Sequence, residues 1–226
     1  MTIIGMVGGR PIKTVFEAIC NNRINAPLAQ YIINDLPDYF WHVPASSSGK
    51  YHPEYALNDG GLARHSLSAL FYLDMILIHP VTWARELPGM AEDAIEWIDE
   101  LSAGIETWVQ EFDEQQIDLL RIAVLVHDGR KSGSQDEYEA NPSTKFDHPI
   151  QMANAVLAIG EEFPLERENC QYIADAIKTH MGKWTTASYA PGIELERPTT
   201  PAQRIVSLAD YLASRKYLPA GYDIEL

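Results

Sequence analysis

The segment Ile122-Ala-Val-Leu-Val-His127-Asp128-Gly-Arg-Lys131 is the most informative part of the chain. Its five apolar residues predict the end of a helix too hydrophobic to face solvent, and a histidine and an aspartate follow directly. A buried carboxylate is costly unless it is paired with a cation or bound to a metal. The His127-Asp128 pair at the end of a core helix therefore predicts a compensating cation.

Four more polar residues fall on the apolar faces of other predicted helices. They are His65, His148, His180 and Asp210, on helices expected over Gly61–Ile78, His148–Phe163, Glu166–His180 and Thr199–Lys216. A single histidine on such a face is usually a hydrogen-bonded core residue. Several of them on separate helices would leave an apolar core with many polar atoms to satisfy. A shared metal centre satisfies them together, and helical bundles build such centres from inward-facing side chains.

The remaining periodicity is also helical, and few segments show the alternation of strands. Further helices are expected over Thr14–Asn22, Ala26–Leu36, Met90–Phe112 and Gln115–His127. Long connections rich in Pro, Gly, Ser and charge are expected over Pro37–Gly60, Gly129–Asp147 and Met181–Pro198. Connections of this length are often lids or binding loops. The prediction is an all-α bundle with long connecting loops.

Composition places the chain among soluble, cytoplasmic proteins. Its 226 residues fit one domain, and 46% are hydrophobic and 22% charged. The apolar runs are too short to span a bilayer, and the N-terminus lacks the basic region of a signal peptide. Cys20 and Cys170 form no metal-binding pattern and suggest buried thiols in a reducing compartment.

The net charge of −15 limits the partners that the surface can attract. Such a surface repels nucleic-acid backbones and anionic membranes. A small anionic substrate stays compatible, because bound divalent cations invert the local sign of the charge. The expected partner is therefore a small phosphorylated substrate such as a nucleotide. Long nucleic acid is disfavoured and no membrane is expected.

The order of the candidate ligands resembles the H…HD…H…H…D signature of HD-domain metal-dependent phosphohydrolases. Five local segments match it: Gly60-Gly-Leu-Ala-Arg-His65-Ser, Val126-His-Asp-Gly-Arg-Lys131, Asp147-His148-Pro, Lys178-Thr-His180-Met-Gly and Leu208-Ala-Asp210-Tyr-Leu-Ala-Ser-Arg215. The resemblance is closest to the branch with HD-type 3′-to-5′ exoribonucleases and related phage or bacterial nucleotide hydrolases, where a Tyr-His pair like Tyr51-His52 precedes the first motif. It implies an HD-domain helical bundle, a single domain over 1–226, with 51–216 as its core and 1–50 as an N-terminal helical extension.

Two positions depart from the family pattern. Gly129-Arg130 replaces the usual apolar residue after the His-Asp pair, and Met181 follows His180 where many relatives carry a second histidine. The first departure alters the loop geometry, and the second removes one ligand or phosphate contact.

The resemblance also implies roles for individual residues. His65, His127, Asp128 and Asp210 would hold one metal ion, and Asp128 would bridge to a second ion held by His148 and His180. Such ligands suit Mn²⁺, Fe²⁺, Co²⁺, Ni²⁺ or Zn²⁺, and Mg²⁺ is also compatible. Lys131 would neutralise a phosphate oxygen. His52 would protonate a leaving group or bind phosphate, because an ordinary histidine pKa lies near neutrality, and Arg215 would contact substrate phosphate.

The leading hypothesis is a phosphohydrolase that cleaves a phosphoester or phosphoanhydride of a nucleotide or short oligonucleotide with a metal-activated water. Three alternatives stay open: a 3′-to-5′ exonuclease on single-stranded nucleic acid, a di-iron HD-type oxygenase, and a non-catalytic nucleotide-binding module. A basic groove would favour the exonuclease, and an oxygen-dependent product would reveal the oxygenase. The N-terminal helices are also a candidate subunit contact in a homo-oligomer.

Overall fold

The computed structural model describes residues 6–7, 10–46, 49–50, 52–79, 81 and 91–215. In these ranges the chain is built from helices, as predicted, and its strands are two short antiparallel segments, β1 (Met6–Val7) and β2 (Arg10–Pro11). Tyr51, Met90 and Lys216, which belong to predicted motifs or helices, lie outside the described residues.

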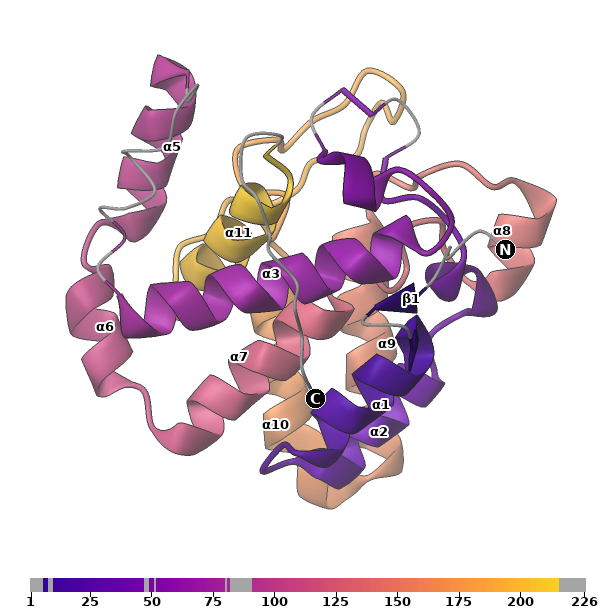
Figure 1. Ribbon diagram of the computed structural model, residues 1–226, viewed down its shortest axis with the longest axis horizontal. Helices are drawn as coiled ribbons and strands as arrows, with labels where there is room; N and C mark the ends of the chain where they lie inside the picture. The colour runs from indigo at the N-terminus through magenta and orange to yellow at the C-terminus, as the bar shows by residue number, and fades with distance from the viewer. Residues whose placement is uncertain are drawn as a thin grey trace.

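Helix α3 (Gly61–Ile78) crosses the middle of the bundle (Figure 1). It packs against α11 (Pro201–Ala213) and against α7 (Glu114–Val126). Helix α10 (Arg167–Ile177) packs along α9 (His148–Glu162) and also contacts α7. These five helices form the core that carries the predicted ligands.

The remaining helices surround this core. The N-terminal pair α1 (Ile12–Asn21) and α2 (Ala26–Asn34) pack together, and α2 contacts α7, while α5 (Glu92–Ser102) and α6 (Ile105–Glu111) lie beside α11. Short helical turns are α8 (Gln135–Ala140) and the 3-10 helices η1 (Asp38–Trp41), η2 (Glu54–Ala56) and η3 (Pro164–Glu166).

Two of the core helices start at reciprocal side-chain caps. Asp113 accepts a hydrogen bond from the backbone N–H of Gln116 at 2.7 Å and donates its own N–H to the Gln116 side chain at 3.1 Å, which fixes the start of α7. Thr200 and Gln203 cap α11 in the same way, with Pro201 in its first turn. These caps fix the starts of the helix that leads into His127 and of the helix that carries Asp210.

Several predicted boundaries are wrong, each for a local reason. The helix expected over Met90–Phe112 is two helices, because Gly104 adopts a left-handed conformation (φ 91°) between α5 and α6. The connection Gly129–Asp147 contains α8, which starts at a Ser134–Glu137 capping box. Helix α10 ends at Ile177, so His180 lies in the following turn and not on the helix.

Among the described residues, α3 is long and apolar enough to pass a membrane-span test by length and composition, a match that the short apolar runs did not predict. However, 67% of it is buried inside the protein. Its apolar surface therefore packs inside the bundle, where α3 is the central helix.

Candidate metal centre

The six predicted ligands converge on one site from five parts of the chain. His65 lies on α3 and Asp210 on α11, His127 and Asp128 directly follow α7, His148 begins α9, and His180 follows α10. The four histidines and Asp128 are at most 2% exposed, whereas the Asp210 side chain is 21% exposed. The cluster is therefore buried and opens toward solvent on the side of Asp210.

The two carboxylate oxygens of Asp128 face different histidines. Oδ1 lies 3.0 Å from His148 Nε2 and 3.4 Å from His180 Nε2. Oδ2 lies 3.7 Å from His127 Nε2 and 3.9 Å from His65 Nε2. One carboxylate thus separates two groups of imidazole nitrogens.

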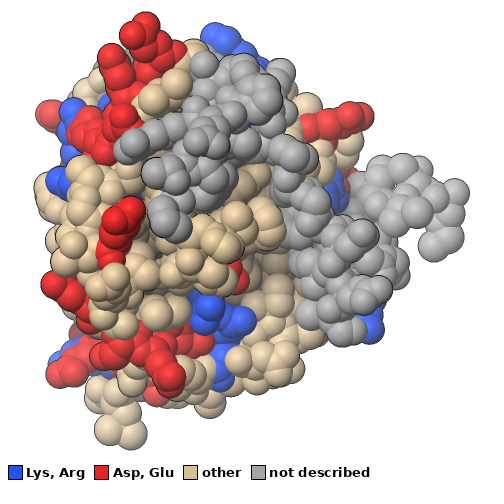
Figure 2. All heavy atoms as spheres, turned by 60° about the vertical axis from the view of Figure 1, so that its left-hand side comes forward, with Lys and Arg blue, Asp and Glu red and all other residues tan. Residues whose placement is uncertain are grey.

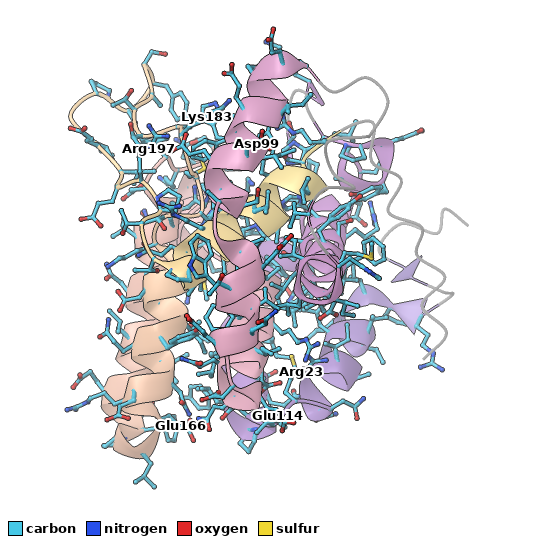
Figure 3. The ribbon with its side chains drawn as sticks, turned by 90° about the vertical axis from the view of Figure 1, so that its left-hand side faces the viewer. Arg23, Asp99, Glu114, Glu166, Lys183 and Arg197 are labelled. Carbon is cyan, nitrogen blue, oxygen red and sulfur yellow. The ribbon has the colours of Figure 1, made fainter. Side chains whose placement is uncertain are left out.

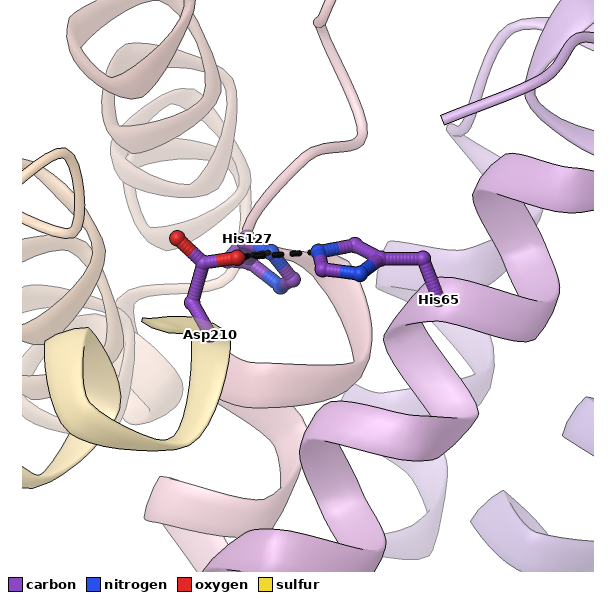
Figure 4. A group of neighbouring side chains, drawn as sticks. All are labelled: His65, His127 and Asp210. Atoms are coloured by element: carbon purple, nitrogen blue, oxygen red, sulfur yellow. Dashed lines mark hydrogen bonds and ion pairs between the residues drawn. The ribbon is translucent and has the colours of Figure 1, made fainter. Parts of the chain in front are cut away.

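Asp210 completes the group that contains His65 and His127 (Figure 4). Its Oδ1 lies 2.9 Å from His65 Nε2 and 3.4 Å from His127 Nε2. The ligand atoms of these three residues lie within 4.8 Å of one another, as do those of His127, Asp128 and His180. Both groups have the spacing that a metal ion requires.

Three of the histidines are oriented by the backbone three residues earlier. The Nδ1 atom of His127 lies 2.7 Å from the Val124 carbonyl, and that of His148 lies 2.6 Å from the Lys145 carbonyl. His180 Nδ1 lies 3.0 Å from the carbonyl of Ile177. A carbonyl can only accept, so each Nδ1 carries a proton and donates it. With Nδ1 engaged in this way, Nε2 is the ring atom that faces the cluster and is left to bind a metal, as in histidines that ligate metals.

Unpaired polar atoms in the cluster fit a metal. Among the described residues, His127 Nε2 is buried without a hydrogen-bond partner, and Asp128 Oδ1 lacks hydrogen-bonding geometry despite its short distances to imidazole nitrogens. Buried polar atoms are seldom left unsatisfied. A nitrogen and oxygen donor set of this kind suits divalent transition metals.

The charges in the cluster also fit metal binding. Burial raises the pKa of Asp128, but the Lys131 ammonium and the neighbouring imidazoles outweigh it and hold that pKa well below its usual range. Burial likewise raises the pKa of Asp210, and the nearby imidazoles of His127 and His65 reverse the effect. Burial lowers the pKa of His180 to about 4, with part of the effect offset by Asp128. Both carboxylates are therefore ionised and His180 is neutral at physiological pH.

Lys131 lies inside the site, but not as a free cation. Its Nζ is 2.5 Å from Asp128 Oδ2, three residues earlier in the chain, and its side chain is 16% exposed. The predicted contact with substrate phosphate would be made from this position, at the edge of the cluster.

His52 also lies beside the cluster, with its ring 5.1 Å from that of His65. Burial, together with the nearby His65 and Lys131, lowers the pKa of His52 to about 3. This lowered pKa favours the neutral ring, and the roles of His52 in protonating a leaving group or binding phosphate stay predictions.

Arg215 lies at the end of α11 with its guanidinium engaged locally. It stacks 4.3 Å from the centre of the Tyr211 ring and donates to the Ser214 hydroxyl at 2.8 Å. These contacts do not place it beside the six ligands, so its phosphate contact stays a prediction.

A residue that the sequence did not single out, Tyr39 on η1, supports the loop after Asp128. Its buried hydroxyl donates to the Gly133 carbonyl at 2.7 Å and accepts from the Ser132 N–H at 3.0 Å. Arg130 in the same loop pairs with Asp35 at 2.5 Å. Tyr39 falls in the predicted connection Pro37–Gly60, but no spacing in the sequence connects it with a loop more than ninety residues away.

Comparison with known proteins identifies the family. The family model of the HD domain matches residues 63–215, a range that contains all six candidate ligands and lies beyond His52 and Tyr39. Neither the curated proteins nor the solved structures include a significant match to the chain. The family model does not separate the branches of the family, so the closer resemblance to exoribonucleases gains no support. Because the match covers more than half of the chain and every helix that builds the centre, the chain belongs to the HD-domain family.

Proposed function

We propose that this chain is a metal-dependent phosphohydrolase that cleaves a phosphoester or phosphoanhydride bond of a nucleotide or a short oligonucleotide. HD domains bind divalent metals and are generally hydrolases. The observation that carries the proposal is the placement of Asp128, whose Oδ1 faces His148 and His180 while Oδ2 faces the opposite group. A carboxylate in this position suits a bridge between two cations.

The cations, Lys131 and His52 would have different roles in the proposed hydrolysis. Two bound cations would supply a water of lowered pKa as the nucleophile and would polarise the phosphate. Lys131, at the edge of the cluster, would exchange its contact with Asp128 for a phosphate oxygen as negative charge develops there. His52 would donate a hydrogen bond from its neutral ring.

The surface supports a small substrate. Figure 2 shows carboxylates gathered in several places on one face, with Lys and Arg in smaller groups. The sequence carries 32 acidic and 17 basic residues, and a long polyphosphate chain needs a continuous basic field. A nucleotide needs only the local charge of the centre.

Phosphate release from a panel of nucleotides and short oligonucleotides tests the proposal, with Mn²⁺, Co²⁺, Ni²⁺, Zn²⁺, Fe²⁺ and Mg²⁺ in turn. We expect turnover of one substrate class that requires added metal and that Asp128→Ala lowers at least 1,000-fold. An oxygen-dependent product with iron, or metal binding without any turnover, would contradict the proposal.

Asp118→Ala is the matched control. Asp118 is an equally buried carboxylate at the other end of α7, where it accepts hydrogen bonds from Asn25. We expect it to lower the free energy of unfolding but to leave metal content and turnover per folded molecule unchanged. His148→Ala provides a second test if Asp128→Ala does not fold.

A further inference from the structure

The connection between α10 and α11 contains a closed loop of eleven residues. The Leu195 N–H donates to the Thr185 carbonyl at 2.8 Å, which joins the two ends, and the Leu195 side chain is buried. Inside the loop the Ala190 N–H donates to the Ala187 carbonyl at 3.1 Å. Compact surface loops with joined ends are frequently functional.

The base of this loop is fixed to α11 next to the metal centre. Trp184 stacks on Tyr211 with ring centres 5.9 Å apart and an angle of 27° between the planes. Tyr211 follows the candidate ligand Asp210, and the Ser207 hydroxyl on the same helix donates to the His180 carbonyl at 3.2 Å. The loop therefore begins on the Asp210 side of the centre.

The base is also fixed to α5. Lys183 and Arg197, from the two ends of the connection, lie beside α5 in Figure 3. Their charged groups are 5.8 and 5.2 Å from the centre of the Trp97 ring, and Arg197 pairs with Glu100 at 2.7 Å. Contacts to two helices hold the loop in one position.

The tip of the loop contacts the segment that precedes His148. Tyr189 meets Phe146 edge to face, with ring centres 6.0 Å apart and planes at 85°. Phe146 is buried two residues before the ligand His148, and its neighbour Lys145 donates its N–H to the Lys131 carbonyl at 2.8 Å. The loop thus connects the Asp210 side with the segment that positions His148 and Lys131.

Tyr189 leaves most of its ring uncovered at this position. It is 66% exposed, whereas Phe146 beneath it is 3% exposed. An isolated exposed tyrosine needs no explanation. Here, however, the ring is held by a closed loop and rests on the segment that leads into the candidate ligand His148.

We propose that Tyr189 stacks on the base of a nucleotide whose phosphate lies at the metal centre. This inference rests on the proposed function and narrows its substrate class to nucleotides recognised by the face of the base. Stacking uses the π-face that every base presents, so it tolerates base identity and favours the larger purines. The contribution belongs to binding and leaves the chemical step unchanged.

Two matched ligand pairs test the inference on the Mn²⁺-loaded protein: adenosine 5′-monophosphate against ribose 5-phosphate, and adenosine 5′-triphosphate against tripolyphosphate. For Tyr189→Ala we expect the Kd measured by calorimetry to rise about tenfold for the member with a base and to stay within twofold for the member without one. Tyr189→Phe keeps the ring and should bind like the unmodified protein. Tyr31→Ala, which removes an exposed tyrosine from α2, controls for surface changes.

The outcomes separate this inference from the proposed function. Equal weakening for both members of a pair, or no weakening for either, would overturn the stacking role. An unmodified protein that binds the nucleotide no better than its base-free counterpart would overturn it too. Base-dependent binding without turnover of any panel member would instead retain the stacking role and reject the phosphohydrolase. Where turnover is found, Tyr189→Ala should raise KM and leave kcat within twofold.

Discussion

Asp128 and Lys131 form an ion pair within the candidate metal centre. Lys131 Nζ lies against Asp128 Oδ2, the oxygen that faces His65 and His127. An ammonium in this position neutralises part of the charge that two buried carboxylates would otherwise concentrate. Bound metal would take over that function and release Lys131 toward the substrate.

This exchange predicts the effect of removing the ammonium. We expect Lys131→Met to lower kcat about 100-fold, because a developing phosphate charge loses one preorganised partner. The control is Lys145→Met, since Lys145 is partly buried in the adjoining segment and contacts the centre through its backbone. Steady-state kinetics with saturating Mn²⁺ gives the measurement, and equal kcat values for the two variants would refute the role.

The two buried cysteines predict that their thiols react slowly in the native protein. Burial raises the pKa of Cys20 to about 12, with a partial offset from Arg23, and burial and Glu166 raise that of Cys170 to about 11. A raised pKa keeps the thiol protonated, so at pH 8 only about one Cys170 side chain in a thousand is the reactive thiolate. We expect neither thiol to react with a disulfide reagent in the native protein, and both to react in guanidinium. Rapid labelling of either thiol before unfolding would show that its helix opens.

The candidate ligands could be picked out from the sequence because each is a polar residue among apolar ones, and the structure brings them together. Asp128 after Val126-His127, or Asp210 within an apolar stripe, stands out by composition alone. The lowered pKa of His52 could not be predicted, because it depends on burial and on the distances to His65 and Lys131. The carbonyls that orient the imidazoles could not be predicted either, because these contacts depend on the backbone turns in which His127 and His148 lie.

At the level of secondary-structure elements, η1 and the loop after α7 act together. A β-carbon at Gly129 would lie 2.4 Å from a methyl carbon of Leu36 and 2.7 Å from the Met152 sulfur, so both side chains would have to shift. The missing side chain lets the segment before η1 approach the loop closely, where Tyr39 and Asp35 bind it. The loop after α7 is thus supported by residues that lie outside the range of the family model.

Removal of the Tyr39 hydroxyl tests this coupling. We expect Tyr39→Phe to lower the free energy of unfolding by about 1–2 kcal/mol, because the Ser132 N–H and the Gly133 carbonyl lose a buried partner. The loosened loop should also weaken Mn²⁺ binding about tenfold, as changes around metal ligands do. Denaturant unfolding and metal titration give the two quantities.

Tyr172→Phe is the control, since the buried Tyr172 hydroxyl has no hydrogen-bond partner in the part of the chain that the structure describes. It should leave both quantities unchanged. A loss of stability in Tyr39→Phe without a change in metal affinity would limit Tyr39 to a structural role.

The helices were easier to predict than the boundaries between them. Helix α3 has the predicted ends because Gly60 and Gly61 precede a continuous apolar face and Pro80 follows it. The break at Gly104 was missed because its flanking residues keep helical spacing, and only the left-handed backbone of this glycine reveals the turn. Helix α8 was missed because it lacks buried residues, so no apolar periodicity marked it.

For the whole molecule, the metal centre joins the core helices at one point. Helices α3, α7, α9, α10 and α11 each contribute or lead into a ligand, and four buried imidazoles and a buried carboxylate meet there. Among the described residues, His127 Nε2 is a buried polar atom of this cluster that has no hydrogen-bond partner. Bound metal satisfies such atoms with coordinate bonds to several helices at once, so metal affinity and unfolding are coupled.

We therefore expect the metal to raise the temperature of unfolding. A ligand at one hundred times its Kd stabilises the folded state by about 2.7 kcal/mol, which for a chain of this size is an increase in Tm of roughly 5–10 °C. Calorimetric scans of the Mn²⁺-loaded and the chelator-treated protein give the comparison. Asp118→Ala should keep the difference and Asp128→Ala should lose it, because only the second removes a ligand. If Mn²⁺ still raises the Tm of Asp128→Ala, the ion binds outside the buried cluster. The cluster would then not be the site through which metal stabilises the bundle.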